Sequence, residues 1–336
     1  MDESPQPPKP QQRLLRRSES VTWCAIALCI LLCSLTPHVS IRLYITDVIA
    51  NFAAHVATCA VILCFATLVR KQRTSTLLLA LSAISAIVSV VSTPRAEWTR
   101  AQQTDLSVLV FNTQSVGDNP EMTLKLILGS NADLVALPEM SLQLMHELET
   151  NPRVQEHYPY FHLEQNRRPG MRTLLSRWPI DELFEQSHRT EWALTPAPSV
   201  FAARVQTPSG DVGILVSHPL APKNPQLWKW GNAAVNAAIS VINDAHALGI
   251  PLVLATDMNA TPSAWRSRAI TRRTGLRRAK PVLRATGTWP AWLFWPLQIA
   301  IDDVWVSHDV RIVSWNTLQV SGSDHLPVMV ELSLNR

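Results

Sequence analysis

The stretch Gly322-Ser323-Asp324-His325-Leu326-Pro327 lies near the C-terminus and places a carboxylate next to an imidazole on a Gly/Ser turn. The apolar run that follows, Val328–Leu332, is typical of a strand. An Asp–His pair held in this way offers a metal ligand beside a general base. A solvated turn can also hold two such residues, so the pair is informative only together with the segments upstream.

Several short apolar runs upstream end in polar residues of the same chemical kinds. The runs typical of strands are Leu106–Phe111, Asp133–Leu137, Val212–Val216 and Pro251–Ala255. A further strand is expected after Ile299–Ile301. Polar residues at strand ends meet where a sheet opens, so we expect them to share one site. With the C-terminal pair, the candidates are Asn112, Glu139, His218, Asp257, Asn259, Asp302, Asp324 and His325.

This set of residues suits hydrolysis of a phosphate ester. Carboxylate oxygens hold a hard divalent cation, which neutralises charge on a phosphoryl group. A histidine oriented by a second carboxylate can deprotonate water. Amides and a second histidine can hydrogen-bond phosphoryl oxygens or protonate the leaving group.

Each candidate also has a structural interpretation. Asn112 can be a strand cap, and Glu139 can begin a helix that starts at Met140. His218 can be a loop histidine, and Asp257 with Asn259 can cap a turn. The neighbour of Asp302, Asp303, is a second candidate for the carboxylate that orients the histidine, although the motif position favours Asp302.

The N-terminal third has a different composition. Val21–Pro37, Val48–Val69 and Ser75–Ser92 contain no Asp, Glu, Lys or Arg and are long enough, or nearly so, to cross a bilayer. A buried core helix is the alternative for any one of them, but three in succession favour membrane spans. The segment before them, residues 1–20, is rich in Pro and Gln and is predicted to be a disordered cytoplasmic tail.

Basic residues predict the orientation of these spans. Lys9, Arg13, Arg16 and Arg17 precede the first span, and Arg70, Lys71 and Arg73 separate the second from the third, whereas the intervening loop has only Arg42 and Asp47. Positive-inside counting puts the N-terminus in the cytoplasm, and three spans then put everything after about residue 93 on the outer, periplasmic side of the cytoplasmic membrane. All five cysteines lie in the first two spans, so the downstream region can hold neither a disulfide nor a cysteine-bound zinc.

Charge is balanced in the downstream region, with 22 Lys and Arg against 22 Asp and Glu from Pro94 onward. A globally basic nucleic-acid-binding surface is therefore not indicated. One local excess of basic residues remains, because no acidic residue occurs between Asp257 and Asp302. It is either a solvated face or a site for an anionic substrate or lipid headgroups, and the substrate-binding candidates are Arg266, Arg268, Arg272 and Arg273.

The order of these motifs resembles the endonuclease/exonuclease/phosphatase superfamily over about Asp105 to Leu334. Gly287-Thr288-Trp289-Pro290 also looks like a membrane-anchored bacterial branch. The ordered series that carries the resemblance is Asn112, Leu137-Pro138-Glu139, Leu175-Ser176-Arg177-Trp178-Pro179, Ser217-His218, Asp257-Met258-Asn259, Ile301-Asp302 and Ser323-Asp324-His325-Leu326-Pro327.

The resemblance implies an α/β four-layer sandwich, two face-to-face β-sheets flanked by helices, preceded here by three transmembrane helices. It implies cleavage of phosphoesters with Mg²⁺ or Mn²⁺. By the same resemblance, the metal residues are Glu139, Asn112 and Asp324, and the pair that orients the water and the phosphate is Asp257 and Asn259. His325 matches the general base, Asp302 the carboxylate that orients it, and His218 the family's second histidine. The sequence departs from the pattern at Thr256, usually Gly, and at Asp303, often His or Tyr.

We therefore expect four parts: a tail (residues 1–20), a membrane anchor (21–93), a linker (94–104) and a catalytic domain (105–336). The predicted function is a membrane-anchored, metal-dependent phosphoesterase acting on a phospholipid headgroup, nucleic acid or small phosphate ester. An extracytoplasmic nuclease is the alternative enzyme, and a catalytically inactive, membrane-tethered binding module is the alternative of another class. Trp289, Trp292 and Trp295 are either core and loop anchors or a lip that dips into the bilayer.

Overall fold

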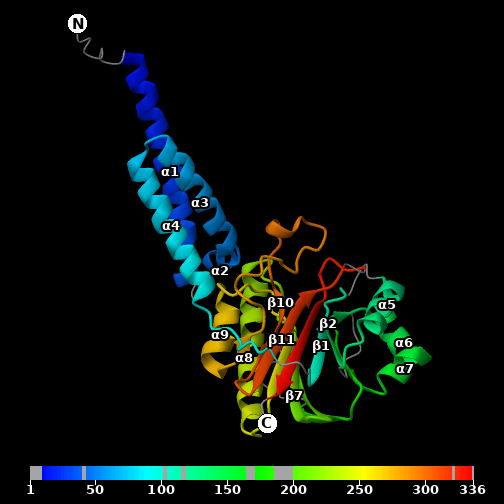
Figure 1. Cartoon of the computed structure of the whole chain (residues 1–336). Helices are drawn as coiled ribbons and strands as arrows, with labels where there is room; N and C mark the ends of the chain where they lie inside the picture. The colour runs from blue at the N-terminus through cyan, green and yellow to red at the C-terminus, as the bar shows by residue number, and fades with distance from the viewer. Residues whose placement is uncertain are drawn as a thin grey trace. The chain divides into compact units, whose positions relative to one another are not determined.

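The computed structural model describes residues 10–39, 43–100, 104–114, 119–163, 171–184, 200–319 and 322–334. The chain divides into two compact units, Met1–Ser92 and Thr93–Arg336 (Figure 1). The first unit is helical over nearly all of its described residues, and the second contains every strand of the described chain.

Four helices form the first unit: α1 (Pro10–Val39), α2 (Tyr44–Ala50), α3 (Ala53–Val69) and α4 (Arg73–Val91). Because α1 begins at Pro10, residues 10–20 are helical, whereas the sequence predicted disorder there. Gln, Leu and Arg, which dominate this segment, are strong helix formers, and Pro is favoured in the first turn, where its missing N–H has no partner to lose. Residues 1–9 lie outside the described part of the chain.

The second predicted span, Val48–Val69, is not one straight helix. α2 and α3 meet at an angle of 67°. Between them, the Asn51 N–H donates to the Val48 carbonyl (3.2 Å), and its side-chain amide donates to the Asp47 carbonyl (3.1 Å), so Asn51 closes α2. Two helical stretches, Ser18–Val39 and Arg73–Val91, are long and apolar enough to cross a membrane, and the bent pair is a third candidate.

In this unit many small side chains are buried and many large apolar side chains are exposed, which is the reverse of the pattern in a water-soluble helix bundle. Small or weakly polar residues face the interior, which lets helix backbones approach closely, as in membrane bundles. Hydroxyl groups bridge the helices: Ser85 donates to the Ser34 carbonyl and Thr76 to the Thr67 hydroxyl, both at 3.0 Å. The buried residues include Ala50, Ala57, Ala60, Ser82, Ala83 and Ala86, whereas Leu32, Ile62, Phe65, Leu68, Leu77 and Ile84 are exposed.

Two mixed six-stranded sheets form the second unit. The β1 sheet has the order β11 (Val310–Thr317), β12 (Val328–Leu334), β1 (Leu106–Val110), β2 (Leu134–Met140), β4 (Met171–Ser176), β3 (Tyr160–Leu163). The β8 sheet has the order β5 (Ile180–Phe184), β6 (Val200–Thr207), β7 (Gly210–Ser217), β8 (Leu252–Asp257), β10 (Asp302–Val306), β9 (Arg277–Arg278).

Helices cover the outer surface of each sheet (Figure 1). Successive side chains of a strand point to opposite faces. In β1, Val110 packs in the core between the sheets and Leu109 packs toward the helices, and in β8 Val253 and Leu254 divide in the same way. The predicted four-layer α/β sandwich is therefore confirmed. Its helices are α5 (Pro120–Ser130), α6 (Leu142–Thr150) and α7 (Pro152–His157) on the β1 sheet, and α8 (Pro225–His246) and α9 (Trp265–Thr274) on the β8 sheet.

Residues 94–104, predicted to be a linker, include a strap over residues 95–99 that joins the two sheets. The Ala96 N–H donates to the carbonyl of Arg278 in β9 (2.9 Å), and the N–H of Ile312 in β11 donates to the strap (2.8 Å). Both β9 and β11 are edge strands. Exposed edges favour unwanted strand pairing, so the strap protects one edge of each sheet.

The strand directions bring distant parts of the chain to one end of the sandwich. β1 and β2 are parallel and end together, as do β7 and β8. β12 runs antiparallel to β1, and β10 antiparallel to β8, so each begins where its neighbour ends. In this register Asp302 lies directly opposite Asp257.

Arg266 of α9 joins that helix to α8 and to the loop after β7. Its guanidinium is buried, donating from Nε to the Asn232 side chain (2.9 Å) and from Nη1 to the Leu220 carbonyl (2.8 Å). Gly231 of α8 leaves the space for this group, because a Cβ there would collide with the guanidinium and the Leu220 carbonyl. The loop held by Arg266 follows directly after His218.

We expect Gly231→Ala to lower the free energy of unfolding by about 2 kcal/mol, because the added methyl group overpacks the Arg266 site. Gly129→Ala in α5 is the matched control: its Cβ meets nothing within 4 Å. It should raise stability by roughly 0.5–1 kcal/mol through helix propensity. Urea unfolding of the purified chain, followed by tryptophan fluorescence, measures both, and equal effects would contradict this account of Gly231.

Candidate functional site

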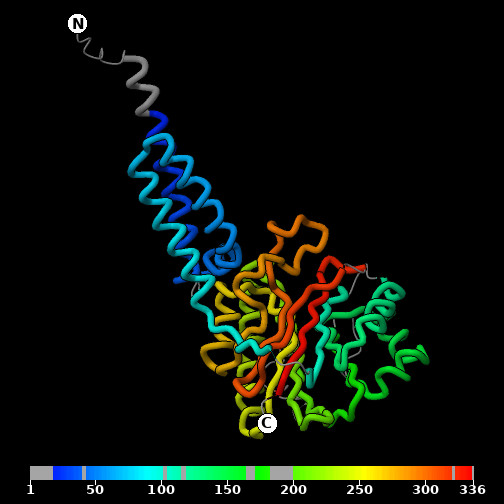
Figure 2. Tube along the Cα trace, viewed as in Figure 1, coloured from blue at the N-terminus to red at the C-terminus, as the bar shows by residue number. Residues whose placement is uncertain are grey.

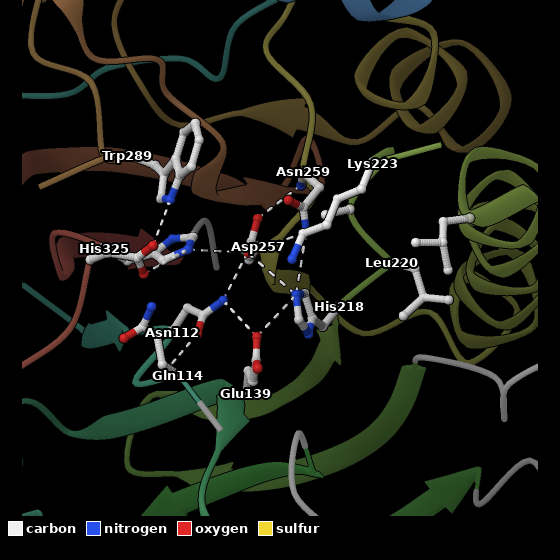
Figure 3. Close-up of a pocket in the computed structure, with 13 residues that line it drawn as sticks. Asn112, Gln114, Glu139, His218, Leu220, Lys223, Asp257, Asn259, Trp289 and His325 are labelled. Atoms are coloured by element: carbon white, nitrogen blue, oxygen red, sulfur yellow. Dashed lines mark hydrogen bonds and ion pairs between the residues drawn. The ribbon is translucent and has the colours of Figure 1, made fainter. Parts of the chain in front are cut away.

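A cavity of about 450 Å³ opens at the end of the sandwich where these strands meet (Figure 3). Seven of the eight residues predicted to share a site line it, and the eighth, Asp302, hydrogen-bonds one of them. The structure thus brings together the residues that the sequence predicted to share a site, and their roles stay predictions. The lining residues are Asn112, Gln114, Glu139, His218, Leu220, Ala221, Lys223, Leu227, Asp257, Asn259, Trp289, Asp324 and His325.

Asp257, at the end of β8, lies at the centre of the polar network. Its carboxylate accepts hydrogen bonds from the Asn112 side chain (2.9 Å) and the Asn259 N–H (2.8 Å), and His218 Nε2 lies 3.4 Å away. Burial by itself raises the pKa of Asp257, but the hydrogen bond with His218 and the charge of His325 outweigh it and lower that pKa to about 2. This carboxylate is therefore a fixed negative charge.

Asn259 has a left-handed backbone with φ of 50°, a conformation that Asn adopts more readily than most residues. The turn directs its side-chain amide back across the cavity. Nδ2 donates to the Pro219 carbonyl (3.1 Å) and lies 3.3 Å from His218 Nε2. Asn259 consequently positions the histidine that follows β7.

His325 and Asp302 form a buried pair. Nδ1 of the imidazole lies 2.9 and 3.1 Å from the two carboxylate oxygens of Asp302, which leaves Nε2 directed toward Asp257 and Asp324. Burial opposes the charged imidazole, but the carboxylates of Asp302, Asp257 and Asp324 outweigh burial and raise the pKa of His325 to about 10. The Asp302 N–H donates to the Thr288 hydroxyl (3.1 Å), which anchors the start of β10.

Asp303 does not contact the site histidine. Because adjacent strand residues face opposite ways, its side chain leaves β10 on the side opposite to that of Asp302. There it pairs with Arg278 and accepts a hydrogen bond from Trp315 Nε1 (2.7 Å). Asp302 is therefore the histidine's partner, as its motif position indicated, and Asp303 has a structural contact.

Asp324 is held by the segment before β10. Trp289 Nε1 donates to its Oδ2 (2.9 Å), and the Ala291 N–H donates to its carbonyl (2.7 Å). Its other oxygen, Oδ1, is buried and has no hydrogen-bond partner among the described residues. The preceding Ser323 donates to the Asn112 carbonyl (2.7 Å), which ties the turn to the end of β1.

Glu139 lies inside β2, which extends to Met140, whereas the sequence predicted a helix from Met140. The pairing register of β2 shifts beyond Leu137, where Pro138 lacks an N–H for the ladder. The Glu139 carbonyl accepts from both the N–H (3.0 Å) and the hydroxyl (2.9 Å) of Thr113. Its Oε2 lies 3.3 Å from the Asn112 amide and 3.6 Å from His218 Nε2, so its carboxylate faces the cavity.

Two groups of residues are candidates for holding a metal ion. Ligand atoms of Asp257, Asp302 and His325 lie within 4.8 Å of one another. The carboxylate oxygens of Asp257 and Asp302 and Nδ1 of His325 are already hydrogen-bonded, so a metal held by these atoms would have to displace those bonds. The oxygens of Glu139, Asp324 and Asn112 fit a hard cation better, because Asp324 Oδ1 is buried without a hydrogen bond and carboxylate and amide oxygens are what Mg²⁺ prefers.

None of the four arginines predicted to bind substrate lines the cavity. Arg266 is buried in the contact with α8, and Arg273 donates to the Asn236 side chain. Arg268 is half-buried and Arg272 is exposed. The basic run therefore reflects helix packing and a solvated helix face, and the cation of the described cavity lining is Lys223.

The cavity also contains residues that the sequence reasoning did not assign. Leu220, Ala221 and Leu227 form an apolar wall between β7 and α8, and Gln114 and Lys223 add polar groups. Leu227 is in the first turn of α8 and the others lie in connecting segments without periodicity, so no sequence signal identifies them as cavity residues. For Trp289 the sequence left two interpretations open, a core or loop anchor and a lip that dips into the bilayer. The motif Gly287–Pro290 was the available signal for its contact with Asp324.

Solved structures of known proteins have a similar architecture, although no curated protein matches the sequence. The structure is similar to an endonuclease/exonuclease/phosphatase of Beutenbergia cavernae (17% identity, TM-score 0.51, 69% of this chain and 72% of that one). It is also similar to the human Nocturnin catalytic domain (18%, 0.52, 72% and 99%) and to a Bacteroides vulgatus endonuclease/exonuclease/phosphatase (15%, 0.52, 69% and 100%). At these identities the likeness concerns the fold.

The family model described as "Endonuclease/Exonuclease/phosphatase family" matches residues 109–325, more than half of the chain. That segment begins in β1 and ends at His325, so it includes every strand after β1 except β12, together with all the residues that line the cavity. The chain therefore belongs to the endonuclease/exonuclease/phosphatase family.

Proposed function

We propose that this chain is a membrane-anchored phosphoesterase that hydrolyses phosphodiester or phosphomonoester bonds with a divalent cation, Mg²⁺ or Mn²⁺. The observation that carries the proposal is one cavity that gathers carboxylates, amides and two histidines from five strand ends, with Asp302 of a sixth strand hydrogen-bonded to His325. Phosphatases and nucleases both occur in the family. A tethered module without turnover would have no need for a buried Asp–His pair beside an oriented second histidine.

The buried residues have distinct proposed roles. Asp302 holds Nδ1 of His325, so Nε2 is the nitrogen available to accept a proton from water as the water oxygen bonds to phosphorus. The bond from phosphorus to the leaving oxygen then breaks, and His218 is placed to give that oxygen a proton. Asp257 and Asn259 orient the water and the phosphoryl group.

The proposed metal residues are Glu139, Asn112 and Asp324. A cation bound there supplies positive charge to the phosphoryl oxygens and offsets the carboxylate charge around His325. Trp289 fixes the Asp324 carboxylate through its indole N–H, which leaves Oδ1 for other contacts. Glu139 is fixed through its own carbonyl by Thr113.

The substrate of this site is proposed to present one phosphoryl group to a partly apolar cavity. Leu220 and Leu227 suit the non-phosphate part of an ester, and Lys223 suits a further negative charge. A nuclease normally uses many basic contacts along the backbone, and the arginine-rich helix α9 does not extend the described cavity lining in this way. Lipid headgroups and small phosphate esters are therefore favoured over nucleic acid.

The membrane anchor is proposed to contain three spans. α3 has 17 residues, no charged side chain, and exposed Ile62, Phe65 and Leu68. It is joined by a short turn to α4, which is long enough to cross a membrane. With Arg70, Lys71 and Arg73 on the cytoplasmic side, three spans place the catalytic domain outside the cytoplasmic membrane, whereas a re-entrant α2–α3 pair would leave it inside.

We expect His325→Ala to lower kcat for a bis-aryl phosphate by about 10²–10⁴-fold, because the general base is lost. Glu139→Gln should lower activity strongly as well, since the proposed cation site loses a charge. His308→Ala is the matched control, because His308 is exposed in the turn before β11. Steady-state hydrolysis assays measure all three, and unchanged activity in the first two variants would rule out these assignments.

Metal removal is expected to abolish hydrolysis reversibly. Chelation with EDTA should stop turnover, and added Mg²⁺ or Mn²⁺ should restore it. Asp324→Asn should raise the metal concentration needed for half-maximal activity by about 10-fold or more, because the site loses a negatively charged oxygen ligand. Metal titration of both proteins measures this, and full activity in excess EDTA would contradict a metal-dependent reaction.

A reporter fused to the C-terminus tests the topology. With three spans, a reporter that is active only in the cytoplasm should be silent, and one that is active only outside should be active. The reverse result would indicate two spans and would overturn the proposed periplasmic location without affecting the proposed chemistry.

A further inference from the structure

The connection between β9 and β10 exposes an unusual amount of apolar surface. Trp292, Phe294, Trp295 and Leu297 are 77%, 67%, 48% and 54% exposed. Outside this connection, no large apolar side chain of the described part of the second unit is more than 46% exposed. Soluble domains rarely gather such residues at one place unless the place makes a contact. Residues 290–297 are called the aromatic loop below.

The aromatic loop is a hydrogen-bonded structure. The Leu293 N–H donates to the Pro290 carbonyl (3.1 Å), and the Leu297 N–H donates to the Phe294 carbonyl (2.9 Å). The buried Gln298 side chain donates to the Leu293 carbonyl (2.9 Å). Figure 2 shows this segment, in orange, extending beyond the strands of its sheet. The fold therefore holds the four apolar side chains outward.

The chemistry of the aromatic loop matches the interfacial region of a bilayer. Trp is enriched at membrane–water interfaces, and Phe and Leu supply the apolar area that buries at the acyl boundary. No acidic residue occurs between Asp257 and Asp302, so nothing in this connection repels anionic lipid. A water-exposed protein surface gains nothing from this composition.

The chain also limits how far this domain can move from a membrane. Three residues, Ser92–Pro94, separate the end of α4 from Arg95, which bridges to Arg278 of β9. Three extended residues reach about 10 Å. If α4 spans a bilayer, the edge strand from which the β9–β10 connection starts is tethered close to its surface.

The aromatic loop is continuous with the wall of the catalytic cavity. Trp289, just before it, lines the cavity and donates to Asp324, and Ala291 within it donates to the Asp324 carbonyl. A surface that contacts residues 290–297 must therefore lie beside the mouth of this cavity.

We propose that the aromatic loop inserts into the headgroup region of a lipid bilayer and holds the cavity at the membrane surface. The insertion itself depends on the anchor, and the consequence that a lipid-borne phosphoester enters the cavity rests on the proposed function. The other conceivable occupant of this surface is a second copy of the chain.

Site-specific labelling of the full chain tests the insertion. In a variant whose five native cysteines are replaced, an environment-sensitive fluorophore is attached at Phe294→Cys or, as control, at Leu248→Cys. Leu248 is also exposed and precedes β8, at the end of that strand away from the cavity. The protein is reconstituted in phosphatidylcholine–phosphatidylglycerol vesicles with nitroxide-labelled lipids.

The label at position 294 should be quenched several-fold more strongly than the label at 248. Equal, water-like signals at the two positions would overturn the proposal. Protection at 294 that persists in detergent and increases with protein concentration would also overturn it, because it would indicate a second copy of the chain.

Hydrolysis provides a second, independent readout. The variant Trp292→Ser/Phe294→Ser/Trp295→Ser should cleave a vesicle-borne phosphoester about tenfold more slowly than the unmodified chain, because the apolar contact with the bilayer is lost. Its kcat for a water-soluble aryl phosphate should be unchanged, since none of the three residues lines the cavity. An equal loss on both substrates would contradict the role in membrane contact. Absence of hydrolysis in the unmodified chain would refute the proposed function but leave the quenching result valid.

Discussion

The burial of two carboxylates side by side constrains the whole of the second unit. Asp257 and Asp302 are opposite each other in neighbouring strands, and both are removed from water. Buried charges are costly unless they are paired and hydrogen-bonded. His325 pairs with Asp302, while Asn112, Asn259 and His218 surround Asp257. These partners come from segments far apart in the chain, so the charge network and the tertiary fold require each other.

The sandwich provides this arrangement through strand direction. Parallel neighbours end at the same edge and antiparallel neighbours begin there, so six segments bring side chains to one cavity or to the hydrogen-bond network beside it. A second buried network stabilises the opposite face of β10, where Asp303 contacts Arg278 and Trp315. Burial lowers the pKa of nearby Lys280 to about 8, a shift that the charge of Asp303 opposes. The excess of basic residues in this part of the chain thus serves packing as much as solvation.

The two units of the chain follow opposite rules of burial. The sandwich buries Val, Leu and Ile in three clusters, whereas the helical unit buries Ala and Ser and exposes large apolar side chains. The first pattern follows from the hydrophobic effect in water, and the second is the pattern expected of helices that pack closely in apolar surroundings. The aromatic loop is the part of the sandwich that departs from the first pattern, which is why its surface stands out.

The sequence alone predicted the fold class, the apolar N-terminal helices and eight polar residues that the structure brings together. These features depend on local patterns: apolar runs of strand length, polar residues at their ends, and charge-free stretches of membrane length. It missed β3, β5, β9, α7 and α9, because short edge strands and an arginine-rich helix carry little apolar periodicity. Only the tertiary structure decided that Asp302 and not Asp303 faces His325, since strand register sets which face each residue occupies. Likewise, it showed that Arg266 is buried beside Gly231 and that the second apolar segment bends at Asn51 and Phe52, because both depend on packing and hydrogen bonds that composition does not record.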